Sequence, residues 1–407
     1  MTAVLAQRVA TPALLARVGA LVRKLMWRAV FTVTGGIRIT GTLPSGPAVL
    51  VANHGSHADT AALLAALPAA RVPVAAAAAD YWFAVRWRRV LVRALAAALP
   101  VPRGTRGGYT AMRAAAAPAL ARGHLVVVYA EGTRTEDGQL GQFRTGALRL
   151  AADCGVPVIP VALVGTREFL PKHGRLAPQP VEVRFGAPIE LGTVEADDAG
   201  AAQLRGQIAE LRDAGPARAP ESGVWAWAAR RADSRWLFLA SFVWGVAEAL
   251  SWPVIAEMYL LMWVACRAHR VLPAAVTLLA GSVTGVVLHA MLSRHGLSLP
   301  RPMTTPQMDA AAAADLSHGA SGMWHQALNG VPVKVYAEQA GQQHTDLLGL
   351  ALWTALARGV RILAVAAVLS VLARLLAPLL QRLYGCYLLL VAGSFLLLVS
   401  LVLQRWS

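Results

Sequence analysis

Apolar and polar positions alternate in short blocks through the first 235 residues of this chain and then give way to long apolar runs. Short apolar runs bounded by turn residues indicate buried strands, and apolar residues at helical spacing indicate helices. We expect strands at 37–42, 48–52, 72–78, 125–129, 158–163 and 181–185, and helices at 59–67, 82–98, 109–121 and 145–152. Strands that alternate with helices predict an α/β fold, a sheet with flanking helices, over residues 35–212.

A helix with one apolar face is expected before this domain, at residues 13–30. Its apolar positions recur every three or four residues, and basic side chains lie at the edge of that face: Leu14, Val18, Leu21 and Leu25, with Arg17, Lys24 and Arg28. Such a helix can lie in the headgroup region of an anionic membrane, so residues 1–34 are predicted to form an amphipathic membrane-surface helix. Packing on the chain's own domain is the alternative.

The second half of the chain has the pattern of a membrane domain. A linker rich in Pro, Gly and Ala is expected at 213–235, followed by apolar stretches at 236–266, 273–293, 359–380 and 383–403 and a polar excursion at 294–346. Runs of about 20 apolar residues are long enough to span a bilayer. We therefore expect an all-α membrane domain of about four helices at 236–407, with the first stretch broken or re-entrant.

Basic residues precede the first apolar stretch, namely Arg230, Arg231 and Arg235. The positive-inside rule places that end in the cytoplasm, so we expect a multi-pass protein of the cell (inner) membrane with a cytoplasmic first domain. Three widely spaced cysteines in 407 residues indicate neither a disulfide framework nor a metal knuckle.

Charge narrows the class of partner. The formal net charge is +16, and residues 1–122 hold 15 Lys and Arg against only Asp59 and Asp80. So basic a segment predicts an anionic partner: a lipid surface, a phosphorylated substrate or nucleic acid. Zinc-finger spacing and RNP-like aromatic motifs are absent from the sequence, and membrane-like segments follow, so nucleic acid is not expected.

His54 and Asp59 form the first candidate for catalysis. They follow the apolar run 48–51 and are five positions apart, about 140° apart if both lay in one helix. We therefore expect His54 in the loop after the strand, with Asp59 in the first helical turn behind it. A carboxylate beside a histidine fixes the tautomer that can accept a proton near neutral pH. A capping or buried histidine is the alternative.

A second motif, Glu131-Gly132-Thr133-Arg134, follows the strand expected at 125–129. The guanidinium of Arg134 offers a planar set of donors suited to a phosphate. The alternative is an ordinary turn with a solvated arginine. His54 and His57 have the spacing of a metal pair, but the sequence offers no third ligand at useful spacing, so no metal is expected.

These motifs, in this order, resemble the PlsC-like family of glycerophosphate and lysophosphatidic-acid acyltransferases. The family carries His-x4-Asp, here His54 to Asp59, then Glu-Gly-Thr-Arg, here Glu131 to Arg134, and an apolar Val-Pro-x-x-Pro block, here 156–160. Tyr129-Ala130 precedes the second motif where Phe-Pro is common. Residues 79–83 depart from the family's usual Lys-x-Glu-Leu, while 100–103 are similar to its Pro-Val-x-Arg.

The resemblance implies transfer of a fatty acyl group from acyl-coenzyme A or acyl-acyl-carrier-protein to the free hydroxyl of lysophosphatidic acid or a related lysophospholipid, with no bound cofactor and no acyl-enzyme. It implies that His54 is the general base, that Asp59 orients it, and that Glu131, Gly132, Thr133 and Arg134 bind the acceptor's glycerol phosphate. Another glycolipid acceptor is also possible.

The membrane half contains ionisable residues in or beside its apolar segments: Glu248, Glu257, Arg358 and Arg361. Such groups are often functional in membranes. The segment 330–337, with 358–361 after it, weakly resembles DedA-like (SNARE-associated Golgi protein type) proteins, which implies lipid movement. The alternatives are therefore a simple anchor, or a lipid transporter or scramblase with an accessory acyltransferase domain.

Overall fold

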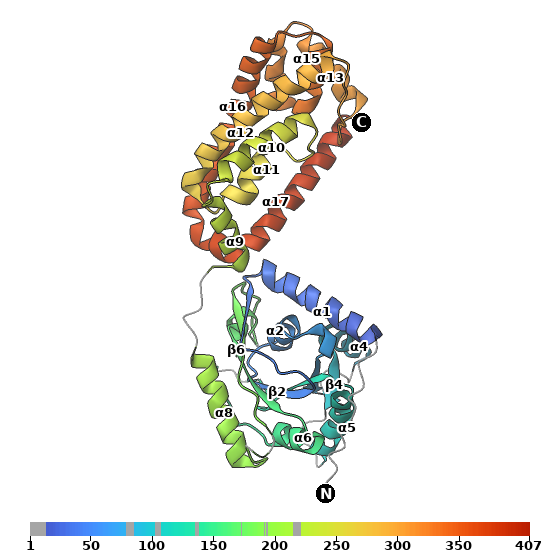
Figure 1. Cartoon of the computed structure of the whole chain (residues 1–407), viewed down its shortest axis with the longest axis vertical. Coiled ribbons are helices and arrows are strands. Elements are labelled where there is room, and N and C mark those ends of the chain that lie inside the picture. Colours follow the sequence, from blue (N-terminus) through green and yellow to red (C-terminus); the bar gives the residue numbers. More distant parts are fainter. Residues whose placement is uncertain are drawn as a thin grey trace. The chain divides into compact units, whose positions relative to one another are not determined.

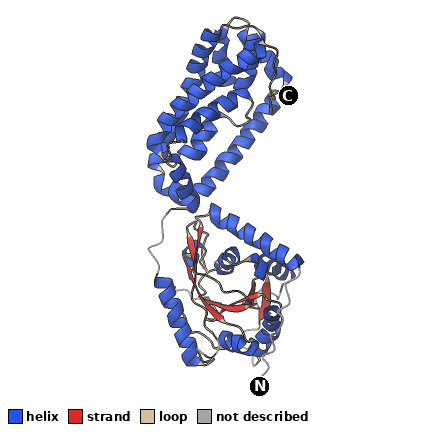
Figure 2. Ribbon diagram, viewed as in Figure 1, coloured by secondary structure: helices blue, strands red, loops and turns tan. Residues whose placement is uncertain are grey.

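The computed structural model describes residues 14–78, 85–101, 107–134, 138–171, 173–190, 192, 194–214 and 221–407. The chain divides into two compact units, 1–223 and 224–407 (Figure 1). The first is an α/β unit and the second is all-helical (Figure 2). Among the sequence-based expectations, residues 1–13, the whole segment 79–83, residues 102 and 103, and residues 215–220 of the linker lie outside the described residues.

A mixed sheet of seven strands forms the centre of the first unit. Its order is β1-β7-β6-β2-β5-β3-β4, and among these described strands β6 and β7 alone form an antiparallel pair. The strands are β1 (Ile37–Thr40), β2 (Ala48–Ala52), β3 (Val74–Ala78), β4 (Ala98–Val101), β5 (Leu125–Tyr129), β6 (Val158–Val164) and β7 (Val181–Phe185). β2 lies in the middle between β6 and β5 and is buried along its whole length. Such a strand needs an apolar side chain at every position, which explains its uninterrupted apolar run.

Helices cover both faces of this sheet. One face packs against side chains of α1 (Leu14–Val33), α2 (Asp59–Ala66) and α7 (Thr166–Phe169). The other face packs against α5 (Gly108–Ala121), α6 (Gly146–Cys154) and α8 (Asp198–Asp213). The remaining elements are the 3₁₀ turn η1 (Ala69–Arg71) and α4 (Arg86–Ala96). The predicted α/β fold with flanking helices is confirmed.

Helix α1 packs on its own unit and also exposes an apolar face. Ala20 and Phe31 are buried, and the Trp27 indole donates to the carbonyl of Leu95 at 2.9 Å. Six large apolar side chains of the same helix are exposed: Leu14, Leu15, Val18, Leu21, Val22 and Leu25. Packing on the chain's own unit and contact with a membrane surface are therefore compatible, because each would use a different face of α1.

Several elements of the first unit differ from the expectations, among them β4 and α8. The helix expected at 82–98 ends at Ala96, and β4 follows it as an edge strand paired with β3. The alanines before Pro100 read as continued helix, whereas Ala97 adopts φ +48°, a left-handed conformation that ends it. Helix α8 was not expected; Asp197 caps it by accepting a hydrogen bond from the backbone of Gly200.

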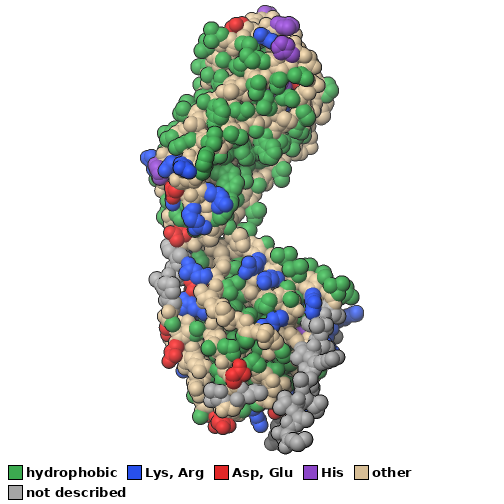
Figure 3. Space-filling model, in the orientation of Figure 1, with side chains coloured by type: hydrophobic (Ala, Val, Ile, Leu, Met, Phe, Trp, Pro, Cys, Tyr) green, Lys and Arg blue, Asp and Glu red, His purple; other side chains and the backbone are tan. Residues whose placement is uncertain are grey.

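The second unit contains three helices long and apolar enough to cross a membrane, counted over the described residues: α12 (Ala268–Arg294), α16 (Leu347–Leu375) and α17 (Ala377–Arg405). A shorter apolar helix, α10 (Leu237–Leu250), packs along α12. Apolar side chains dominate the visible surface of this unit (Figure 3). These features indicate a membrane protein, with three long spans where about four were expected.

Shorter elements complete the second unit: α9 (Gly223–Ala232), α11 (Ala256–Tyr259), the π-helical turn η2 (Leu260–Val264), α13 (Pro306–Leu316), η3 (Ala320–His325), α14 (Gln326–Asn329) and α15 (Val333–Gln342). The stretch at 236–266 is broken, as expected, because Pro253 separates α10 from α11. The linker expected at 213–235 is helical in its second part, as α9. The span expected at 359–380 crosses the junction of α16 and α17, and the polar excursion contains α15, of which eight residues are buried.

Candidate active site

The register of the sheet brings the two sequence motifs together. β2 and β5 are parallel neighbours, and Ala52 pairs with Tyr129 at their carboxyl ends. His54 and Glu131 each follow two residues later, so both motifs begin at the same edge of the sheet. Ligand sites in open α/β sheets lie at this edge, outside the carboxyl ends of the strands.

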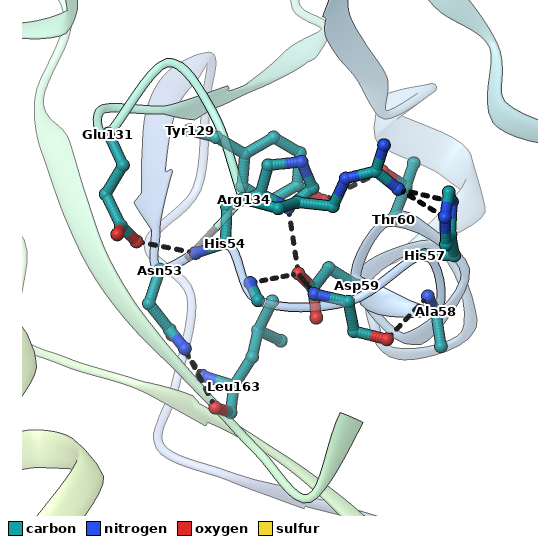
Figure 4. Close-up of polar contacts among 12 residues, drawn as sticks. Asn53, His54, His57, Ala58, Asp59, Thr60, Tyr129, Glu131, Arg134 and Leu163 are labelled. Atoms are coloured by element: carbon teal, nitrogen blue, oxygen red, sulfur yellow. Dashed lines mark hydrogen bonds and ion pairs between the residues drawn. The ribbon is translucent and has the colours of Figure 1, made fainter. Parts of the chain in front are cut away.

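His54 and Asp59 contact each other as expected. The imidazole Nδ1 lies 2.8 Å from Asp59 Oδ2, and the same oxygen accepts hydrogen bonds from the backbone N–H groups of Gly55 and Ser56, each at 2.9 Å (Figure 4). Asp59 is fully buried in the first turn of α2, whereas the His54 side chain is 21% exposed. The carboxylate therefore holds Nδ1 in its protonated form and leaves Nε2 to accept a proton.

Ser56 does not cap α2 directly, although it is a good N-cap residue. The N-cap position is Ala58, and the Ser56 hydroxyl accepts from the Ala58 backbone at 2.9 Å while donating to the Leu170 carbonyl at 2.6 Å. Ser56 therefore fastens the histidine loop to the segment after α7.

Tyr129, the last residue of β5, supports the flat face of the histidine. The two ring centroids are 4.0 Å apart and the rings are nearly parallel, with 17° between their planes. The Tyr129 hydroxyl is 2.8 Å from the hydroxyl of Thr60, the residue after Asp59. Burial raises the pKa of Tyr129 well above its ordinary value, so the hydroxyl stays protonated.

Glu131 and Asn53 tie the histidine loop to its neighbours. Glu131 is buried; one carboxylate oxygen accepts from the His54 backbone N–H at 2.7 Å and the other from that of Gly141 at 2.8 Å. The Asn53 amide donates to the Leu163 carbonyl at 3.0 Å and accepts from its N–H at 2.7 Å. In this geometry the Glu131 carboxylate is directed at the backbone, a positioning role that the sequence did not indicate.

The remaining residues of the second motif have different environments. Gly132 has φ +72°, and a Cβ there would lie 3.2 Å from the Arg144 guanidinium, so the turn needs glycine. Thr133 is exposed. Arg134 Nη1 contacts both ring nitrogens of His57, one of them at 2.8 Å. Arg134 and Glu131 lie on opposite sides of His54 in Figure 4. Because Glu131 bonds the His54 backbone and Arg134 contacts His57, the second motif contacts the histidine loop at two points.

A cleft of about 310 Å³ opens beside the motifs. His54 and Glu131 line it together with the loop from β6 to α7, including Thr166 and Arg167. Among the described residues, no three His, Cys, Asp or Glu side chains converge as metal ligands would, and His57 faces Arg134.

A second polar cluster lies in the membrane unit, at the ionisable residues that the sequence singled out. Arg358 is fully buried and pairs with Glu248 at 2.7 Å, and Arg361 pairs with Glu257 at 2.6 Å. The pairs link α16 to α10 and α11. This cluster belongs to the second unit and is separate from the site at His54.

Comparison with known proteins places the first unit in a class. Residues 36–164 match the family model described as Acyltransferase. Both motifs lie inside that range. Residues 36–164 of the first unit therefore match an acyltransferase domain, and the resemblance stated for it is confirmed. The match ends at residue 164, so the DedA-like resemblance of the membrane half stays a prediction.

Individual relatives carry more specific descriptions than the family model. The chain is 30% identical over 166 residues to 1-acyl-sn-glycerol-3-phosphate acyltransferase alpha of Mus musculus, which covers 38% of this chain and 54% of that protein. It is 48% identical over 50 residues to the chloroplastic enzyme BAT2 of the same description from Brassica napus, covering 12% and 14%. The chain thus spans about half the length, or less, of these relatives.

One solved structure is also similar: the 1-acyl-sn-glycerophosphate (LPA) acyltransferase PlsC from Thermotoga maritima. The TM-score is 0.41 at 20% sequence identity, with 49% of this chain and 80% of that chain covered.

Proposed function

We propose that this protein transfers a fatty acyl group from an acyl thioester to the free hydroxyl of lysophosphatidic acid, 1-acyl-sn-glycerol 3-phosphate, in phospholipid synthesis. The observation that carries the proposal is the contact between His54 Nδ1 and the buried Asp59 carboxylate, in the same site as Arg134. The relatives' names support this acceptor. Other lysophospholipids or glycolipids are the alternatives within the same chemistry.

The proposed reaction is a direct transfer. His54 Nε2 takes the proton of the acceptor hydroxyl while its oxygen attacks the thioester carbonyl. The C–O bond forms, the C–S bond breaks, and the leaving thiolate takes the proton back from the imidazolium. A thioester is already activated, so a well-placed base contributes roughly 10²–10⁴-fold. Asp59 stabilises the imidazolium that forms in this step.

Each motif has a defined part in this proposal. Arg134 grips the acceptor phosphate, and it has to leave His57 or share its donors to do so. Glu131 and Asn53 hold the histidine loop, and Gly132 allows the turn between Glu131 and Arg134. The donor is acyl-coenzyme A or acyl-acyl-carrier-protein, bound only as a cosubstrate. We place the acyltransferase domain on the cytoplasmic side of the cell (inner) membrane, on the basis of Arg230, Arg231 and Arg235.

The test is acyl transfer to lysophosphatidic acid by the full chain in lipid vesicles. We expect His54→Ala to lower kcat by about 10²–10⁴-fold, because the base is lost. The matched control is His173→Ala, an exposed histidine of the same unit, which should keep wild-type activity. Equal activity of His54→Ala and the wild type would remove His54 from the mechanism.

A second candidate function concerns the membrane unit. The buried pairs Arg358–Glu248 and Arg361–Glu257 exceed what an anchor needs, because ionisable groups in apolar helices are costly and are often retained for transport. In that case the second unit moves lipid across the bilayer and the acyltransferase domain is accessory. Loss of lipid movement, without loss of acyl transfer, in variants of these pairs would support it.

A further inference from the structure

The support beneath the catalytic histidine is a feature that the Glu-Gly-Thr-Arg and His-x4-Asp motifs do not include. Asp59 contacts one edge of the His54 ring, at Nδ1, and Tyr129 covers one face of it. The two contacts are connected through α2, because the Tyr129 hydroxyl is hydrogen-bonded to Thr60, the residue after Asp59. The ring is thus confined by an edge contact and a face contact that share one helical turn.

We propose that Tyr129 is a positioning residue for the base: its ring, held by the Thr60 hydroxyl, keeps the His54 imidazole aimed at the acceptor and stabilises the imidazolium that forms during transfer. This inference rests on the proposed function. It concerns residues outside both motifs, and the hydroxyl pair requires Tyr at 129 together with Thr at 60.

The physical basis is the geometry of the stack. An aromatic face carries partial negative charge, so a cation over it is stabilised more than a neutral ring. The imidazole is neutral before it takes the acceptor's proton and cationic afterwards, so the contact strengthens as the reaction proceeds. An interaction that is stronger in the transition state than in the ground state raises kcat rather than lowering KM.

The hydroxyl pair sets the orientation of the stack. A tyrosine ring at the end of a strand can turn about its side-chain bonds unless something holds its tip. The 2.8 Å bond to Thr60 fixes that tip against α2, the same helix that carries Asp59. Other charged or titratable groups near the ring are Glu131 and Arg134 from the loop after β5 and His57 from the loop before α2 (Figure 4). The cleft that His54 lines is also lined by Arg167 and Glu168 of α7 and by Arg212 and Asp213 of α8.

Three variants of the full chain separate the parts of this support. Tyr129→Leu removes the aromatic face, Tyr129→Phe keeps the face but loses the hydroxyl, and Thr60→Val removes the partner hydroxyl. Tyr109→Phe is the matched control, because its hydroxyl bonds Asp153 elsewhere in the same unit. Each variant is assayed for acyl transfer to lysophosphatidic acid across pH, with kcat and acceptor KM measured separately.

We expect Tyr129→Leu to lower kcat about 10-fold, to leave acceptor KM within about 2-fold, and to move the acidic limb of the kcat/KM profile down by about half a pH unit, because the imidazolium loses stabilisation. Tyr129→Phe and Thr60→Val should each lower kcat by about 2–5-fold. Their combination should lose no more than either alone, since both remove one bond. Tyr109→Phe should match the wild type.

A second measurement needs no acceptor and therefore separates this inference from the proposed function. Diethylpyrocarbonate modifies neutral imidazole, so the modification rate of His54 against pH, read by peptide mass spectrometry, reports its protonation in the full chain. A lower pH midpoint of His54 modification in Tyr129→Leu supports the positioning role of Tyr129, even if lysophosphatidic acid is not the acceptor. An unchanged midpoint together with an unchanged pH profile of transfer would overturn it, as would additive losses in the double variant.

Discussion

Asp59 Oδ2 receives three donors, the His54 ring and two backbone N–H groups, and so fixes both the tautomer of the base and the loop that carries it. Glu131 links the histidine loop to Gly141, because one of its oxygens accepts from the backbone N–H of His54 and the other from that of Gly141. At the residue scale, both acidic side chains of the motifs are thus engaged with the protein itself. The basic side chain, Arg134, instead contacts the exposed side chain of His57, a contact that the proposed function has it exchange for the acceptor phosphate.

This difference predicts different kinetics for the two ends of the second motif. In Glu131→Gln one of the two carboxylate oxygens becomes an NH₂ group, so the N–H of His54 or Gly141 loses its acceptor. We expect kcat to fall about 10-fold with little change in acceptor KM. Arg134→Ala should instead raise acceptor KM. Steady-state kinetics with lysophosphatidic acid checks both, and a KM effect confined to Glu131→Gln would reverse the assignment.

The sequence predicted part of this site and missed the rest for a definite reason. His54 and Asp59 are five residues apart, so a loop argument sufficed to place them in contact. Tyr129 was noted only as a departure from Phe, because its position over His54 depends on the pairing of Ala52 with Tyr129, which is a property of the sheet. Likewise, the backbone partner of Glu131 at Gly141 lies across a turn that periodicity does not specify.

At the element scale, two helices of the membrane unit cross at small residues. Gly281 and Gly285 of α12 are four positions apart, and Gly245 of α10 faces α12. A Cβ on Gly281 would lie 2.0 Å from the Phe242 carbonyl oxygen. This spacing of small residues lets membrane helices approach closely. The apolar pattern predicted α12 well, but the close partner α10 was too short to be read as a separate helix.

Gly281→Val is therefore expected to push α10 and α12 apart and to destabilise the second unit by roughly 1–3 kcal/mol. Thermal unfolding of the full chain in detergent measures the change. Gly393→Val is the control, because a Cβ there meets nothing within 4 Å. Equal melting temperatures for the two variants would show that the contact does not matter for stability.

The residue before β5 is a histidine whose protonation opposes folding. His124 is buried, and burial, with the nearby Arg122, lowers its pKa from the ordinary value of 6.5. Below that value the unfolded chain binds a proton that the folded chain resists, so stability falls as the pH drops through about 6.5 and is restored above it. We expect His124→Gln to melt with a weaker dependence on pH between 7.5 and 5.5 than the wild type. The exposed His318→Gln, as control, should retain the full dependence.

At the scale of the whole molecule, the buried ion pair of the second unit can be tested apart from the acyltransferase site of the first unit. The buried Arg358 holds the charge of Glu248 inside the helical unit. Arg358→Ala leaves that carboxylate without its partner, and we expect a loss of about 3–5 kcal/mol in the stability of the second unit. Exchanging the charges, Glu248→Arg with Arg358→Glu, should recover part of it. Thermal unfolding in detergent checks the order of the three proteins.

The same variant separates the two candidate functions when acyl transfer is measured beside movement of a fluorescent lysolipid across vesicle membranes. If the second unit only anchors the enzyme, neither rate depends on the ion pair as long as the chain is folded. If it moves lipid, the exchange variant, although folded, loses that movement. A fall in acyl transfer alone would contradict both alternatives.

The α/β character of residues 35–212 followed from composition and periodicity, whereas the linker was expected at 213–235 and the chain divides into its two compact units at residue 223. The count of membrane helices did not follow from composition and periodicity. The run 236–266 is broken at Pro253, as expected, whereas the run expected as one span at 359–380 is divided between α16 and α17. Composition measures how apolar a segment is, whereas proline positions and packing determine where its helices end.

The apolar window of α17 has no part buried within the protein. In water, this exposed leucine-rich helix would associate with the same helix of other copies, and the protein would aggregate as soon as it is synthesised. The folded protein therefore stays in solution only when lipid or detergent covers α17. A preparation without lipid or detergent would have to lack α17.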